Sequence, residues 1–218
     1  MYEYERQHAL IITTSTYDGL KTDNGQPIPN VPVAYHMGSY VEDRLRELGF
    51  KDVVKISDPS FAQLRKALAT INARINEDEA EDVNGLLFVY YCGHGFYDGK
   101  TFHSVQGNSE KMNAKRSHPL EEEIRYYSTN CNSMFCCLFD CTLLNHSVSN
   151  YDLDTSYTDD THYMMSFSTT QPTDGNMPPN FRPRAFEYFK AIKDAAPLQG
   201  NKFVYPVMIE SLNSFKHK

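Results

Sequence analysis

The sequence lacks the marks of membrane proteins, secreted proteins and nucleic-acid-binding proteins. Its longest apolar run, 86–91, is far shorter than the roughly 18 residues that cross a bilayer. Lysine and arginine number 21 against 28 aspartate and glutamate residues, a net charge of −7, so the composition predicts no basic surface for nucleic acid. Residues 1–6 do not begin a secretory signal. We therefore expect a cytoplasmic protein, in the cytosol or nucleus, with no membrane or nucleic-acid partner.

Cysteine is too scarce and too unevenly placed for a disulfide framework. The five cysteines stand at positions 92, 131, 136, 137 and 141, and an odd number without an export signal favours reduced thiols. Cys136 and Cys137 are adjacent, so on a strand they would point to opposite faces. With no partner Cys-x-x-Cys or histidine pair elsewhere, the spacing predicts no structural zinc site.

The apolar residues that are present suit a single α/β domain. They make up 40% of 218 residues, enough for one core of ordinary size. The run 86–91 is apolar throughout, which is typical of a central parallel strand covered on both faces. We predict a three-layer sandwich with a central, mostly parallel sheet and helices on both faces. The expected strands are 9–14, 53–56, 86–91, 134–139 and 163–168, and the expected helices are 34–48, 61–75, 119–128, 185–195 and 206–215.

One segment, 150–161, differs from the rest in composition. It mixes four aspartates with serine, threonine and tyrosine, and we expect an exposed loop there. A separate acidic turn, 77–82, is expected to end the helix 61–75. Calcium requires several convergent oxygens, which four aspartates could supply, although most such charged runs are simply solvated. We therefore expect no cofactor and no bound metal, with calcium as the alternative.

Reactive side chains follow two of the predicted strands. His94, flanked by glycines, comes after 86–91, and Cys141 comes after 134–139. If the two strands are neighbours, an imidazole and a thiol meet at one edge of the sheet, as a Cys–His nucleophilic pair requires. A glycine turn would let His94 project and would aim the Gly95 N–H at a developing oxyanion. The alternative is an ordinary turn beside a buried cysteine that acts as a small hydrophobe.

Four motifs in order carry a resemblance to a known family. They are an Ala-Leu-Ile-Ile strand at 9–12, a Leu-Gly-Phe helix end at 48–50, a strand ending in Gly-His-Gly at 88–95, and a strand that runs to a cysteine at 134–142. This arrangement resembles the caspase and metacaspase group of cysteine peptidases. The resemblance implies a single caspase-like domain over 1–218, with a large-subunit-like part at 1–149, an acidic linker at 150–162 and a small-subunit-like part at 163–218.

The resemblance also implies roles for individual residues. His94 would be the general acid and base, the Gly95 N–H would form part of the oxyanion hole, and Cys141 would be the nucleophile. Asp140 resembles the aspartate with which metacaspases bind arginine or lysine of the substrate. The implied function is a cysteine-type endopeptidase acting on a peptide or protein substrate. Members of this family often dimerise through the last strand, so a homodimer through the edge strand is a further expectation.

The position of the nucleophile has two interpretations. The caspase signature is Gln-Ala-Cys, with the histidine about 50 residues upstream. Here the chain reads Asp140-Cys141-Thr142, and both 141 and 142 suit that spacing from His94. If Asp140 stands two places before the nucleophile, Thr142 occupies the position of the cysteine, and a threonine hydroxyl without an N-terminal amine is a poor nucleophile. Either Cys141 attacks, or the protein is a pseudo-peptidase that serves as a protein-interaction or regulatory module.

Overall fold

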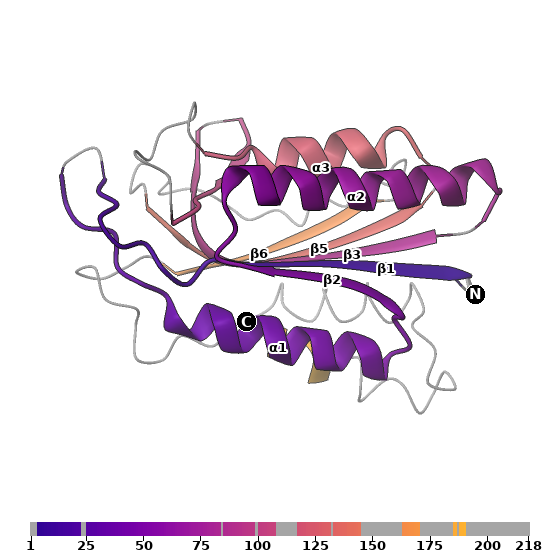
Figure 1. The fold of residues 1–218 in the computed structure, drawn as a ribbon, viewed down its shortest axis with the longest axis horizontal. Coiled ribbons are helices and arrows are strands. Elements are labelled where there is room, and N and C mark those ends of the chain that lie inside the picture. Colours follow the sequence, from indigo (N-terminus) through magenta and orange to yellow (C-terminus); the bar gives the residue numbers. More distant parts are fainter. Residues whose placement is uncertain are drawn as a thin grey trace.

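The computed structural model describes residues 4–22, 25–83, 85–98, 100–107, 117–131, 133–144, 163–170, 185–186 and 188–190. Five strands form a parallel sheet in the order β2-β1-β3-β5-β6, and β4 adds to β3 in the antiparallel sense. Helix α1 covers one face of this sheet, and α2 and α3 cover the other (Figure 1). The strands are β1 (Arg6–Thr13), β2 (Asp52–Ser57), β3 (Gly85–Tyr97), β4 (Phe102–Ser104), β5 (Met134–Leu143) and β6 (Tyr163–Thr170), and the helices are α1 (Pro32–Glu47), α2 (Phe61–Ala80) and α3 (Leu120–Ser128).

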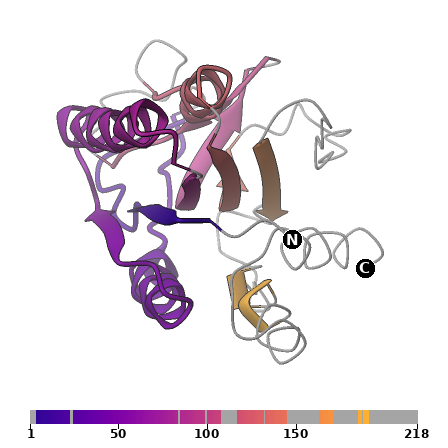
Figure 2. The same ribbon diagram turned by 90° about the vertical axis from the view of Figure 1, so that its right-hand side faces the viewer.

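The predicted α/β class, with a mostly parallel sheet and helices on both faces, is confirmed. Figure 2 looks along the sheet and separates the two helical layers, with α1 on one side and α2 on the other. The short runs of residues that favour β-structure form strands, and the segments with apolar residues at helical spacing form α1, α2 and α3. No helix in the described part of the chain is both long and apolar enough to span a membrane.

Strand β3 lies at the centre of the sheet and is buried on both faces. Phe88 and Tyr90 belong to the apolar cluster beneath α1, whereas Val89 and Tyr91 belong to the cluster beneath α2 and α3. Burying each side chain of this size contributes about 1.5–3 kcal/mol to folding. Successive residues therefore alternate between an α1 face and an α2/α3 face, and the same alternation continues in β5.

Both central strands are longer than the sequence predicts. β3 continues through the expected glycine turn to Tyr97, because its end pairs with β4, and β5 continues to Leu143 between β3 and β6. The turn expected at 92–95 is therefore not formed. Gly95 and Asp140 stay in these strands because each has a paired strand on both sides.

Helix α2 begins at the predicted residue, Phe61, and ends later than predicted. Its N-cap is Ser60, whose side chain accepts a hydrogen bond from the Gln63 N–H while the Gln63 side chain accepts one from the Ser60 N–H. The acidic residues from 77 onward were expected to end the helix, but α2 continues to Ala80. The reason is that Asp78 is buried and contacts Arg6 and His8, so its carboxylate does not need water and the helix can continue past it.

Parts of the prediction lie on residues that are not described. Of the expected helix 185–195, residues 185–186 and 188–190 are helical. The remainder of that helix, the expected helix 206–215 and the acidic segment 150–161 lie outside the described residues.

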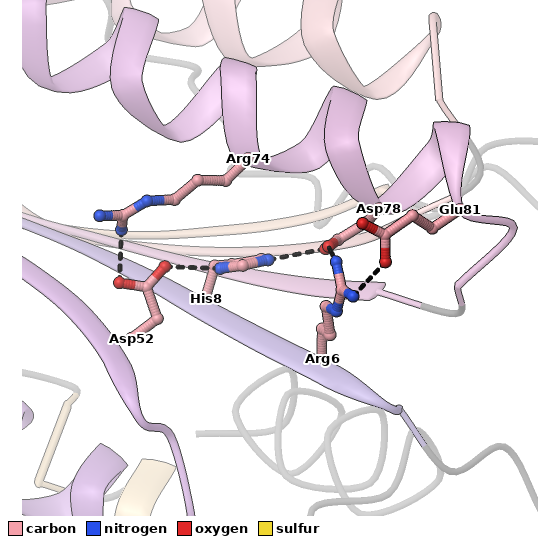
Figure 3. Close-up of polar contacts among 6 residues, drawn as sticks. All are labelled: Arg6, His8, Asp52, Arg74, Asp78 and Glu81. Atoms are coloured by element: carbon pink, nitrogen blue, oxygen red, sulfur yellow. Dashed lines mark hydrogen bonds and ion pairs between the residues drawn. The ribbon is translucent and has the colours of Figure 1, made fainter.

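A buried histidine joins β1, β2 and α2 at the amino ends of the strands. His8 Nδ1 lies 2.7 Å from an Asp52 oxygen, and Nε2 lies 2.6 Å from an Asp78 oxygen (Figure 3). Both ring nitrogens face a carboxylate, so both bonds form when both nitrogens carry a proton. Arg74 pairs with Asp52, and Arg6 lies 2.8 Å from the other oxygen of Asp78, which is 1% exposed. The carboxylate of Asp78 therefore has two side-chain partners, His8 and Arg6.

Replacing His8 by alanine should destabilise the protein by about 2 kcal/mol or more, because it removes one of two partners from a buried carboxylate. Urea unfolding followed by circular dichroism measures this loss. The matched control is Arg46→Ala, which breaks a more exposed pair with Glu42 within α1 and should cost about 0.5 kcal/mol or less. Equal losses for the two variants would contradict the importance assigned to His8.

Candidate functional site

The candidate site lies where β3 and β5 end, around a histidine that contacts Tyr17 and Pro29. His94 stands in β3 and is 2% exposed. Its ring packs edge-on against Tyr17, with 4.6 Å between the ring centres, and its backbone N–H donates to the Tyr17 hydroxyl at 2.7 Å. Its Nε2 lies 2.7 Å from the carbonyl oxygen of Pro29. Since a carbonyl only accepts, Nε2 carries the proton and Nδ1 is the basic nitrogen of the neutral ring.

Gly93 lets Tyr17 approach the backbone at this point. Its φ is 157°, and a Cβ at this position would lie 2.6 Å from the Tyr17 hydroxyl and 2.9 Å from that of Tyr91. Burial raises the pKa of Tyr17, so its hydroxyl stays neutral and accepts from the His94 N–H. This glycine was expected to form a turn. It lies instead within β3, where the missing side chain lets the Tyr17 hydroxyl come close to the backbone.

Gly95 also lies inside the sheet. It pairs with Ser104 of β4 on one side and with Leu143 of β5 on the other, and its carbonyl accepts from the Leu144 N–H at 2.9 Å. The ring of Phe102 fills the space that a side chain at 95 would need. The oxyanion role predicted for the Gly95 N–H stays a prediction, and the turn on which it was based is replaced by strand.

The structure does not bring the predicted dyad of His94 and Cys141 together. Cys141 is fully buried on the α2/α3 face, in the cluster that contains Tyr91 and Phe139. His94 packs on Tyr17, which belongs to the cluster on the α1 face. The backbone of the sheet therefore lies between the thiol and the imidazole. The physical reason is that β5 continues as a strand through 141, so side-chain alternation fixes the face of this cysteine.

The surroundings of Cys141 also oppose ionisation. Burial raises the pKa of this thiol well above its usual range, and the neighbouring charge of Asp140 raises it further. A nucleophilic cysteine needs the opposite, a cationic or basic neighbour that favours the thiolate. Position 142, rather than 141, is the register partner of His94 in the pairing of β3 with β5.

Asp140 is buried and accepts hydrogen bonds within the fold. Its carboxylate is 1% exposed and accepts hydrogen bonds from the Tyr90 hydroxyl at 2.9 Å and from the Ala185 N–H at 3.1 Å. These bonds connect β5 to β3 and to the helical residues that begin at 185. Because the carboxylate is 1% exposed, it leaves no surface on which the cation of a substrate could rest, as the substrate-binding role implied by the resemblance would require. Its contact with the Ala185 N–H is instead that of a cap on a backbone group.

A second histidine near β4 was not foreseen from the sequence. His103 lies 2.9 Å through Nδ1 from the Ser117 hydroxyl and 3.0 Å through Nε2 from an Asp98 oxygen. Although this order resembles a hydrolytic triad, His103 and Ser117 are 4% and 5% exposed, and the imidazole is stacked on Phe96. The chain of hydrogen bonds therefore braces the β3–β4 hairpin. An Asp-Gly pair at 98–99, a typical hairpin signal, was the clue in the sequence.

Metal ligands do not cluster in the described residues: no group of three or more histidine, cysteine, aspartate or glutamate side chains there could hold an ion. The calcium alternative depends on 150–161, outside the described ranges, and stays a prediction. No protein-family model and no curated protein matches the sequence. The function is therefore argued from the site itself.

The burial of the cysteines predicts their order of reaction. Cys131 is half-buried and the other four are fully buried, so N-ethylmaleimide should modify Cys131 first in the native protein. Peptide mass spectrometry after timed quenching measures each rate, and all five thiols should react together in urea. Modification of native Cys141 as fast as or faster than Cys131 would contradict its assigned position.

Gly93→Ala should destabilise the protein by about 2–4 kcal/mol, because the added methyl group meets two buried hydroxyls and the φ disfavours a side chain. The control is Gly49→Ala, which also has a positive φ, of 97°, but open space around the position. Its cost should be about 1 kcal/mol. Denaturant midpoints compare the two, and a cost at 93 no larger than that at 49 would refute the close-approach argument.

Proposed function

We propose that the protein is a non-catalytic relative of the caspase-like peptidases, a pseudo-peptidase of the same fold that acts in the cytoplasm as a protein-interaction or regulatory module. The parallel sheet with helices on both faces is compatible with a caspase-like sandwich. The histidine of the resembled dyad is present and oriented by Pro29 and Tyr17. The partner would be a peptide or protein that is bound without being cleaved.

One observation carries this proposal: the position opposite His94 holds threonine, and the cysteine next to that threonine, Cys141, is on the other face of the sheet. Peptide hydrolysis by a thiol requires that the sulfur and the base come within hydrogen-bond reach, directly or through one water. A thiol that is separated from the base by the sheet cannot transfer its proton to Nδ1. A threonine hydroxyl at 142 would have one histidine and no amine to activate it, which is insufficient for useful attack.

Attack by Cys141 would require β5 to slip by one residue. Such a slip would move Phe135, Cys137 and Phe139 from the α2/α3 face to the other face, because the side-chain period of a strand is two. It would also remove Asp140 from its bonds to Tyr90 and Ala185. The active cysteine endopeptidase is therefore the less favoured function, because its nucleophile could reach the base only if buried side chains of β5 left their apolar cluster.

A restored nucleophile tests the proposal. Four proteins are compared: the unaltered protein, His94→Ala, Thr142→Cys, and Thr142→Cys with His94→Ala. Each is treated with peptidyl acyloxymethyl ketones carrying arginine, lysine or aspartate beside the warhead, with and without calcium. We expect covalent labelling at 142 in the Thr142→Cys single variant only, because a thiol there stands opposite the base. Labelled positions are mapped by mass spectrometry, and circular dichroism checks that each variant is folded.

Each result decides between the candidates. Labelling of Cys141 in the unaltered protein that disappears in His94→Ala would overturn the proposal in favour of an active endopeptidase. Failure of Thr142→Cys to react faster than the half-buried Cys131 would count against the caspase-like assignment itself. Labelling confined to 142 and dependent on His94 supports both the fold assignment and the loss of the native nucleophile.

A further inference from the structure

A second surface lies at the β2 edge of the sheet, two strands away from β3. A hollow of about 430 Å³ opens between β2 and α2. Its lining is half apolar, with Val54, Ile56, Pro59 and Ala67, and half polar, with Ser57, Gln63, Lys66 and Thr70. Figure 2 places β2 at the outer margin of the sheet, between α1 and α2. This surface contains none of the residues of the candidate site, so its role is a separate question.

The strand side of the hollow is apolar and incompletely covered. Val54 and Ile56 are half-buried, whereas their register partners on β1, Leu10 and Ile12, are fully buried. All four side chains are on the α2/α3 face. Residues of a parallel sheet are usually covered on both faces, so the exposed part of Val54 and Ile56 is apolar area that a further element could cover.

The backbone of β2 offers the means of holding such an element. β2 pairs with β1 along one edge, and within the described ranges no strand pairs with its other edge. In an edge strand, alternate N–H and C=O groups point away from the sheet and can pair with an added strand. An extended peptide would therefore gain main-chain hydrogen bonds from β2 and side-chain contacts from the hollow.

Charge decides which peptide fits. The two charged residues of β2 already have partners: Asp52 pairs with Arg74, and Lys55 pairs with Glu42 of α1. Lys66 of α2 lines the hollow and is exposed, and in the described part of the chain no carboxylate lies within ion-pair distance of it. The hollow is thus bordered by a cation whose charge is not balanced locally, in a protein whose net charge is −7.

We infer that the β2 edge binds an extended segment of a partner protein as an added strand. In that segment a valine or isoleucine enters the hollow, and a glutamate or aspartate two residues away, on the same face of the strand, pairs with Lys66. The inference goes beyond the proposed function, because it concerns another surface and holds whether or not a thiol at 142 is reactive.

Two hexapeptides test it. Val-Thr-Glu-Thr-Val-Thr has valine and glutamate on one face, and its matched control has lysine in place of glutamate. Each is titrated into the full-length, isotope-labelled protein up to millimolar concentration at low salt, and backbone amide signals are followed by nuclear magnetic resonance. We expect the acidic peptide to bind about tenfold more tightly than the basic one, with shifts in the amides of 52–57 and in α2 around Lys66.

Charge reversal provides the deciding comparison. Lys66→Glu should reverse the preference, so that the basic peptide binds more tightly, while Lys100→Glu, an exposed lysine between β3 and β4, should leave it unchanged. Absence of binding, equal binding of the two peptides, or an unchanged preference in Lys66→Glu would each overturn the inference. Shifts confined to residues around His94 would assign peptide binding to the candidate site and would equally overturn it.

Discussion

Side-chain alternation along β3 and β5 is the constraint on which the rest of the structure depends. Both strands are buried on both faces, so each residue must belong to one of two cores, and a displacement by one place would invert every contact. This requirement fixes His94 on the side of Tyr17 and Cys141 on the side of Tyr91 and Phe139. The chemistry that the site can perform follows from packing, because the core decides which side chains meet.

Histidines connect elements in this fold in three different ways. His8 joins two carboxylates at the amino ends of the strands, His94 reaches a loop carbonyl near their carboxyl ends, and His103 joins a serine to an aspartate beside the β3–β4 hairpin. Each ring is almost fully buried, so each polar contact it makes replaces one to water. Of the three, only His94 stands where two central strands end side by side, with Thr142 as its register partner on β5.

The class of the fold could be predicted because its signals are local and strong. The continuous run 86–91 predicted a central strand, and the helical spacing of apolar residues predicted α1, α2 and α3. The ends of β3 and β5 could not be predicted, since Gly93, Gly95 and Asp140 disfavour strands in isolation and stay in them through neighbours distant in sequence. The sequence singled out His94 as a candidate site residue, but the face of Cys141 could not be predicted because it depends on how far β5 extends.

The most direct measurement of the central claim is the set of nuclear Overhauser contacts from the β protons of Cys141, in protein labelled selectively at cysteine and at the aromatic residues. The account predicts contacts to ring protons of Tyr91 or Phe139, which share the α2/α3 face with this thiol, and none to the imidazole of His94. Contacts between Cys141 and the His94 ring would place the thiol beside the base and contradict the account.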